Sequence, residues 1–201
     1  MSNPGYYNTI AQDAVAEFKD RGSKFIGYAY PISDVNDFKE KLAHIKKEHP
    51  KATHHCFAYR LGLDGTVYRS SDDGEPSGTA GRPILGQIDS KQLTDVLVIV
   101  VRYFGGTLLG VPGLINAYKT TAALVLQVTP LVQKPVLIPY QLSFDYTVMN
   151  DVMTICKQLD CQVLRQDMTL FCSMRIGIPQ NRLDEVLYRI KDLRSVEIEQ
   201  A

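Results

Sequence analysis

The sequence lacks an excess of charge of either sign. Its 22 lysine and arginine residues balance 22 aspartate and glutamate residues, so the formal net charge is zero. The balance holds on both sides of Leu131. A chain without a net field has no general attraction for nucleic acid or for a membrane surface. Any site for a polyanion must therefore be a local patch of basic side chains.

Long hydrophobic runs are also missing. No apolar stretch approaches the roughly eighteen residues of a membrane-spanning helix, and the N-terminal segment lacks the basic and apolar regions of a signal peptide. Cysteine is scarce, and the spacing of its four positions fits no zinc pattern. These positions are Cys56, Cys156, Cys161 and Cys172. We expect a cytoplasmic protein without membrane contact, whose cysteines are reduced core thiols.

Several motifs that identify cofactor sites and nucleophiles are absent. The chain contains neither G-x-x-x-x-G-K-[ST] nor G-x-G-x-x-G, so an ATP or dinucleotide site is unsupported. Its acidic residues lack the alternating spacing of an EF-hand loop. Ser77 does not lie in the G-x-S-x-G elbow of hydrolases. We therefore expect no cofactor and no bound metal.

The patterns that are present predict a mixed α+β protein. Apolar residues at helical spacing predict a helix over 35–45, which Ser33 or Asp34 can cap. Strands are predicted at 54–62, 66–71 and 94–104. The first two are joined by a hairpin turn, and the third is apolar enough to be a central strand covered on both faces. A helix over 114–128 should follow, with Ile115, Tyr118, Ala122 and Val125 on one face.

The segment 131–139 contains prolines, which stiffen the chain and remove hydrogen-bond donors, so we interpret it as a linker. It separates an N-terminal domain, 1–130, from a C-terminal domain, 140–201. The second domain has the order β-α-β-β-α-β, which is typical of a ferredoxin-like fold. Its predicted apolar faces are Leu142, Phe144 and Tyr146; Met149, Val152, Met153, Cys156 and Leu159; and Leu170, Cys172, Met174, Ile176 and Ile178.

Carboxylates and glycines are concentrated in SDDGEPSGTAGRPIL, residues 71–85. Asp72, Asp73 and Glu75 could ligate a hard cation such as magnesium, or act as a general acid or base. The same composition is also typical of a turn. Residue types alone leave a plain loop and a functional loop both open.

A second glycine cluster, Gly105 to Gly113, follows the predicted central strand. Its backbone could approach a ligand closely, and the next helix should begin near Gly113. The free N–H groups of that helix, with Arg102 and Lys119 nearby, could accept an anion such as phosphate. A tight turn that serves only packing is the alternative.

Other side chains near these loops could also contact a ligand. On a strand, His54 and Cys56 should point to one face and His55 to the other. His55 could donate to the acidic loop, and Tyr103 and Phe104 could stack on a base. A structural histidine and aromatic packing are the plainer interpretations.

Four stretches together resemble a known family. SDDGEPSGTAGRPIL, followed by VLVIVVRYFGGTLLGVPGLINAYKTTA, is similar to the signature of the IMPACT family, which includes the bacterial YigZ-like proteins. RGSKFIGYAYPI and HHCFAYRLG resemble further blocks of that family, so the match spans about residues 12–126. Pro112 stands where a small residue would be expected, which should stiffen the loop more than it alters chemistry.

The resemblance implies an N-terminal domain with the domain-two-like fold of ribosomal small-subunit protein five. It implies a C-terminal ferredoxin-like domain similar to the last domains of elongation factor G. Eukaryotic relatives regulate translation by competing for a partner of the kinase that phosphorylates an initiation factor. We expect the acidic loop to pair with Arg102 and to form, with the RYFGG loop, one cleft of both charge signs. The expected cleft residues are His55, Asp72, Asp73, Glu75, Ser77, Gly78, Thr79, Arg102, Tyr103, Gly105, Gly106 and Lys119.

Three functions stay open at this point. The first is a non-enzymatic regulator of translation that binds the ribosome, RNA or a translation-factor protein through this cleft, with no DNA specificity. The second is a metal-assisted enzyme that acts on a phosphorylated small molecule, with the acidic loop holding the metal. The third is a protein-interaction module without a small ligand.

Overall fold

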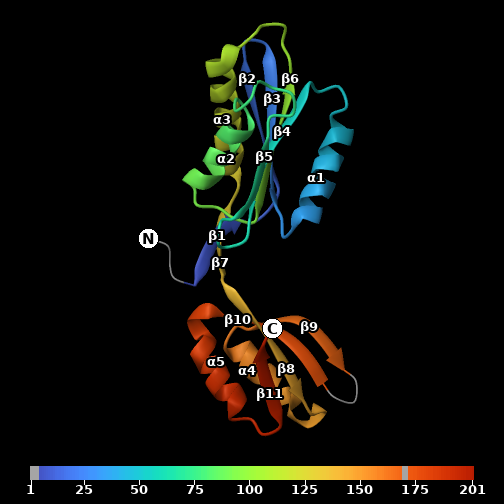
Figure 1. Ribbon diagram of the computed structural model, residues 1–201, viewed down its shortest axis with the longest axis vertical. Helices are drawn as coiled ribbons and strands as arrows, with labels where there is room; N and C mark the ends of the chain where they lie inside the picture. Colours follow the sequence, from blue (N-terminus) through green and yellow to red (C-terminus); the bar gives the residue numbers. More distant parts are fainter. Residues whose placement is uncertain (1–4, 169–171) are drawn as a thin grey trace. The chain divides into compact units, whose positions relative to one another are not determined.

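The computed structural model describes residues 5–168 and 172–201. Leu170, which the apolar pattern assigns to a strand face, lies outside the described residues. The chain forms two compact units. One is Asn8–Gln133, and the other is Lys134–Ala201 together with the segment up to Tyr7. The α+β class expected from the sequence is confirmed in both units (Figure 1).

The N-terminal unit is built on a five-stranded antiparallel sheet with the order β2-β3-β6-β4-β5. The strands are β2 (Ala14–Asp20), β3 (Ser23–Pro31), β4 (His54–Leu61), β5 (Val67–Ser71) and β6 (Val96–Tyr103). The β-branched run places β6 in the middle of the sheet, as predicted. The predicted hairpin of β4 and β5 is also present.

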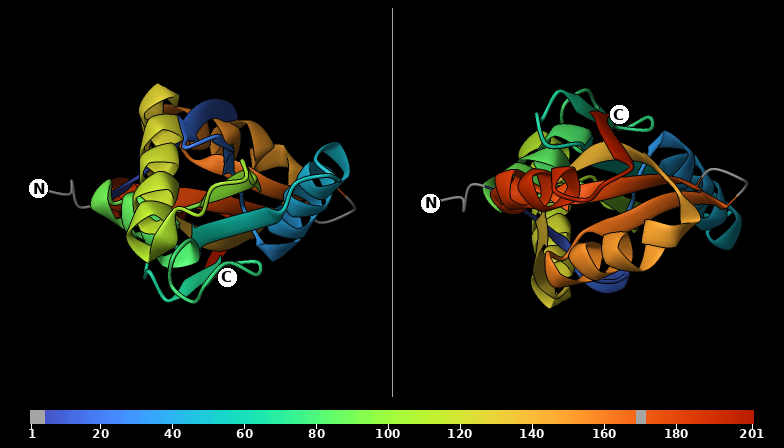
Figure 2. Two further views of the ribbon diagram at one scale, coloured as in Figure 1. Left: turned by 90° about the horizontal axis from the view of Figure 1, so that it is seen from above. Right: turned by 90° about the horizontal axis from the view of Figure 1, so that it is seen from below.

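Helices cover both faces of this sheet (Figures 1 and 2). They are α1 (Val35–Glu48), α2 (Gly81–Ser90) and α3 (Gly110–Val128). Asp34 caps α1, because its carboxylate accepts the N–H groups of Asn36 and Asp37. The helix expected from about Gly113 begins at Gly110 instead. Its buried face contains Leu114, Ala117 and Tyr118, and Ile115 lies outside that face and is exposed, contrary to the prediction.

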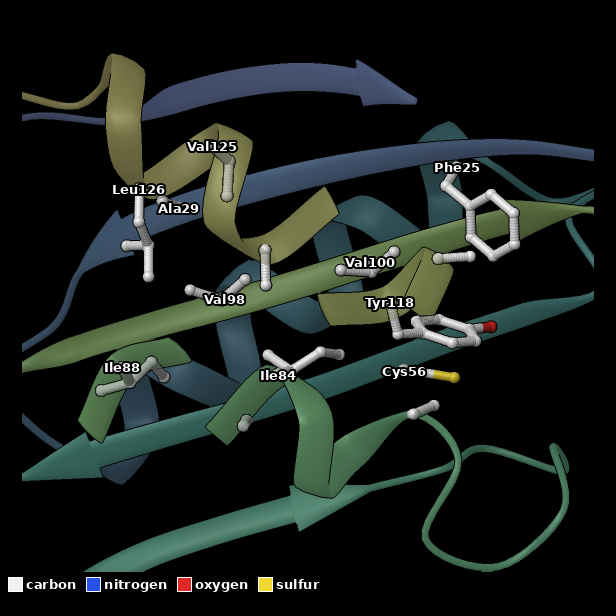
Figure 3. Close-up of a cluster of buried hydrophobic side chains, with 14 of the residues drawn as sticks. Phe25, Ala29, Cys56, Ile84, Ile88, Val98, Val100, Tyr118, Val125 and Leu126 are labelled. Carbon is white, nitrogen blue, oxygen red and sulfur yellow. The ribbon is translucent and has the colours of Figure 1, made fainter. Parts of the chain in front are cut away.

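The two faces of the sheet bury separate cores. Figure 3 shows the core beneath α2 and α3, where Ile84, Val100 and Tyr118 meet. On the other face of the sheet, Phe38 and Ile45 of α1 pack against strand side chains such as Phe57 and Ile99. These strand residues alternate along the chain with those of the core beneath α2 and α3. The sheet is therefore a rigid layer against which α3 packs, and this packing fixes the loops at the N-terminal end of α3.

The C-terminal unit confirms the ferredoxin-like prediction. Its four antiparallel strands have the order β11-β8-β10-β9, and two helices supply the rest of its core. Its elements are β8 (Leu137–Phe144), α4 (Met149–Gln158), β9 (Gln162–Met168), β10 (Cys172–Pro179), α5 (Leu183–Lys191) and β11 (Val196–Gln200). Tyr146 is 70% exposed, because β8 ends at Phe144 and a 3₁₀ turn follows. Met153 is also exposed, so its place in the buried stripe was wrong.

The segment 131–139 carries strand structure. Strand β7 (Leu131–Pro135) pairs with β1 (Tyr6–Ile10) in a two-stranded sheet, and β8 begins at Leu137. Among the residues that the structure describes, no helix is long and apolar enough to cross a membrane. The four cysteines are free thiols. Three of them are buried as expected, but Cys161 is partly exposed.

Candidate functional site

A pocket of about 420 Å³ lies in the N-terminal unit, where the 72–80 loop meets the end of β6 and the start of α3. Its lining residues are Thr53, His54, Glu75, Pro76, Arg102, Phe104, Leu108, Leu109, Gly110, Val111 and Leu114. Most of these side chains are apolar. The polar ones come from the end of β6, the start of β4 and the acidic loop, so three separate segments build the site.

The polar part of the pocket is a buried ion pair. Arg102 Nη1 donates to Glu75 Oε1 at 2.6 Å, and the Tyr118 hydroxyl donates to the same oxygen at 2.8 Å. The side chains of Arg102 and Glu75 are only 6% and 4% exposed. His54 Nε2 lies 3.8 Å from the same Glu75 oxygen. The predicted pairing of the acidic loop with Arg102 is therefore confirmed, and the two charges neutralise each other.

Aromatic rings hold the guanidinium in place. The Arg102 group lies 5.5 Å from the ring centre of Phe25 and 5.6 Å from that of Phe104, which favours a cation–π interaction with both. Arg102 Nη2 donates to Ser23 Oγ at 3.4 Å. Its buried Nε has no hydrogen-bond partner among the described residues. Arg102 is thus anchored by packing as well as by Glu75.

Beneath the pocket, two neutral donors fasten the acidic loop to the core. Figure 3 shows the Tyr118 hydroxyl and the Cys56 sulfur at the same end of the core. The Cys56 thiol donates to the carbonyl oxygen of Asp72 at 3.0 Å. Burial raises the pKa of both groups, so they stay protonated at neutral pH and can donate. They therefore fix the loop that carries Glu75.

Asp72 organises the turn between β5 and α2. Its carboxylate accepts the backbone N–H groups of Gly78, Ala80 and Gly81 at 2.8, 3.0 and 2.8 Å. Partial burial on its own raises the pKa of the Asp72 carboxyl, but these three donors and the nearby Arg82 together hold that pKa below its usual value. The carboxylate therefore acts as the cap that starts α2.

Replacing Asp72 with alanine is expected to lower the free energy of unfolding at neutral pH by about 2 kcal/mol, because three N–H groups lose a charged acceptor. Since the folded-state pKa is depressed, this contribution is present above the ordinary pKa and is lost as the pH falls below about 4. Denaturant titrations of both proteins at about pH 7 and about pH 3 should show a difference that shrinks at the acidic pH. An equal difference at both pH values would contradict this role.

The three acidic side chains point to different partners. Asp73 Oδ2 accepts the backbone N–H of His55 at 2.7 Å, and Asp73 Oδ1 lies 3.7 Å from Lys46 Nζ. Asp72 faces the start of α2, and Glu75 faces Arg102. Among the described residues, no group of three or more His, Cys, Asp or Glu side chains is placed to hold a metal ion. Each of the three carboxylates of the acidic loop is therefore engaged by a different partner.

Strand alternation sends two of the expected cleft residues to the other face of the sheet. His55 Nε2 donates to the carbonyl oxygen of His49 at 3.1 Å, and burial lowers the pKa of His55. The Tyr103 hydroxyl lies 2.8 Å from His49 Nδ1. His54 and Cys56 share the opposite face, as predicted. Neither His55 nor Tyr103 lines the pocket.

The other residues that the sequence assigned to the cleft do not line the pocket. Gly105 lies against the backbone of Gly22, and its N–H donates to Ser23 Oγ at 3.2 Å. The Thr79 hydroxyl donates to the carbonyl oxygen of Pro76 within the loop. Ser77 and Lys119 are exposed and do not line the pocket, and neither do Asp72, Asp73, Gly78 and Gly106. Of the expected cleft residues, only Glu75 and Arg102 line it.

Sequence reasoning missed the apolar wall of the pocket. Leu108 is 82% exposed, and Phe104 and Val111 are exposed beside it. Apolar residues within a glycine-rich loop could have indicated this wall from the sequence, because exposed apolar clusters often mark interaction sites. His54 was also passed over in favour of His55. The pocket is therefore less charged than the expected cleft.

Comparisons with known proteins agree on one family. Residues 21–126, which include every lining residue of the pocket, match the model of the Impact N-terminal domain. An IMPACT family member from Haemophilus influenzae is 34% identical over 175 residues, covering 85% of this chain and 84% of that protein. The family member YigZ of Escherichia coli is 32% identical over 172 residues, with coverage of 85% and 84%. A crystal structure of a hypothetical protein, 28% identical, has a TM-score of 0.80 and covers 98% of each chain.

Proposed function

The chain belongs to the IMPACT family, and from this premise we propose that it is a non-enzymatic regulator that binds a protein of the translation machinery. The expected partners are a ribosomal protein or a ribosome-bound factor. The contact is made by the pocket between the 72–80 loop and the segment 104–114. An apolar side chain of the partner enters this pocket.

The observation that carries this proposal is the chemistry of the pocket. Its one guanidinium, on Arg102, is already paired with Glu75, and no lysine is among the lining residues. A site for RNA phosphates would need cations that are free to replace counterions. The exposed side chains at the rim, Phe104, Leu108 and Val111, are instead of the type that packs against an apolar anchor of a partner protein. The chemistry of the pocket thus favours a protein partner over an RNA partner.

Leu108→Asp and Val111→Asp are expected to weaken co-sedimentation with ribosomes by about tenfold or more. Burial of one such side chain contributes about 1.5–3 kcal/mol, and each 1.4 kcal/mol corresponds to about a factor of ten in affinity. Leu63→Asp is the matched control, because Leu63 is an exposed leucine of the same unit outside the pocket lining. The variants would be compared with the unmodified protein at low and moderate salt.

The salt series separates the remaining alternatives. Contact through an apolar pocket should persist at moderate salt, whereas binding to RNA phosphates should weaken steeply as salt rises. Equal binding by Leu108→Asp and Leu63→Asp would remove the pocket from the contact. No sedimentation of the unmodified protein at either salt would contradict the proposed role in translation.

A further inference from the structure

The C-terminal unit brings two cysteines together at the end of α4. Asp160 has a positive φ of 56°, and the N–H of Cys161 donates to the carbonyl oxygen of Cys156 at 2.8 Å. The bond joins the first and last of six consecutive residues, and the fifth of them, Asp160, has the left-handed backbone conformation. This is the Schellman motif, which ends many helices. It also brings the side chains of the first and last residues of the motif into contact. The helix terminus itself therefore places the two thiols side by side.

The two cysteine side chains influence each other's ionisation. The neighbouring Cys161 lowers the pKa of the Cys156 thiol, and the neighbouring Cys156, together with burial, raises the pKa of Cys161. One thiol of the pair therefore favours the thiolate and the other keeps its proton, which is the arrangement of a nucleophilic thiol beside a second thiol.

Both cysteines form part of the wall of one surface hollow. The hollow has a volume of about 530 Å³ and is also lined by Met153, Lys157 and Val163. Cys156 is 2% exposed and Cys161 is partly exposed, so the hollow would admit a small oxidant more readily than a large one. Cys156 belongs to the same core as Cys172, but Cys156 also lines the hollow, whereas Cys56 and Cys172 are buried and do not line it. These two serve as internal references.

We propose that Cys156 and Cys161 are a redox modification site, which closes to a reversible disulfide when the protein meets a peroxide. The Cys156 thiolate attacks one oxygen of hydrogen peroxide, the O–O bond breaks, and the second oxygen leaves as hydroxide and becomes water. Cys156 is then a sulfenic acid. The sulfur of Cys161 attacks it, an S–S bond forms, the S–O bond breaks, and the hydroxyl leaves as water with the proton of Cys161. Two thiols are oxidised and one peroxide is reduced to two waters.

The test treats the full chain with hydrogen peroxide, alkylates the remaining thiols after denaturation, and identifies the modified peptides by mass spectrometry. Cys156 and Cys161 are expected to disappear together, at least about tenfold faster than Cys56 and Cys172, as one intramolecular disulfide. A dithiol reductant should restore both. In Cys161→Ser no disulfide should form, and dimedone should trap a sulfenic acid at Cys156.

Three results would overturn the proposal. The first is equal rates of loss for all four thiols, and the second is full retention of Cys156 and Cys161 at peroxide levels that oxidise a free thiol. The third is a disulfide between any other pair. Because each is measured on the unmodified chain, the conclusion does not depend on the folding of the variant. None of them bears on the pocket of the N-terminal unit.

Discussion

Replacing Arg102 with leucine is expected to lower the free energy of unfolding by about 3–5 kcal/mol, because it leaves the carboxylate of Glu75 buried without its cation. The Glu75 side chain is 4% exposed, so water cannot take the place of the guanidinium. The Tyr118 hydroxyl would remain as a single neutral donor to that carboxylate. Urea titrations followed by circular dichroism measure the loss directly.

The double variant Arg102→Leu, Glu75→Leu is the matched control. Replacing a buried ion pair by apolar side chains of similar size is often close to neutral, so much of the loss should be recovered. The two single variants and the double variant form a cycle that isolates the coupling of the pair. A loss below about 1 kcal/mol for Arg102→Leu, or a double variant that equals the sum of the single ones, would contradict the described pairing.

Gly105→Ala is expected to lower the free energy of unfolding by about 3 kcal/mol, the upper end of the cost of overpacking. A Cβ on residue 105 would overlap the carbonyl group of Gly22 and the backbone nitrogen of Ser23. These are backbone atoms of the turn between β2 and β3, so they cannot move aside as a flexible side chain would. Gly22 itself has a φ of 81°, which restricts the turn further. The same variant should also weaken ribosome binding, because Phe104 of the pocket precedes Gly105.

Gly86→Ala is the control for this prediction. Gly86 lies inside α2, and a Cβ there would meet nothing within 4 Å. Alanine should therefore stabilise the protein by about 0.5–1 kcal/mol, since glycine in a helix is unfavourable by that amount. Equal effects of the two substitutions would show that the close approach of Gly105 to Gly22 is not a constraint.

Elements with a strong local pattern were predictable. The β-branched run of β6 and the helical spacing of α1 each suffice to identify the element, and the hairpin of β4 and β5 follows from its turn residues. Helix α2 was not predicted, because Gly81, Pro83 and Gly86 oppose a helix locally. Burial of Ile84 and Ile88 against the sheet, with the cap from Asp72, outweighs that local preference.

The candidate site was only partly predictable. A pairing of the acidic loop with Arg102 was expected from the sequence, and the structure shows that Glu75 is the residue of the loop that makes it. Tyr103 was misplaced although it adjoins Arg102 on one strand, where neighbours must face opposite ways. The place of the apolar wall in the pocket was not predictable, because an exposed leucine such as Leu108 belongs to no local motif and only the fold brings it next to Phe104 and Val111.

The order of residues by itself determined the neutral charge, the α+β class, the ferredoxin-like unit and the family, because each depends on composition or on neighbours along the chain. Only the tertiary structure decided which groups meet. Glu75 contacts Arg102 across 27 positions and Tyr118 across 43. Such contacts depend on how α3 and the acidic loop pack on the sheet, and no local pattern carries that information. The pocket, its paired charges and its apolar rim are therefore properties of the fold.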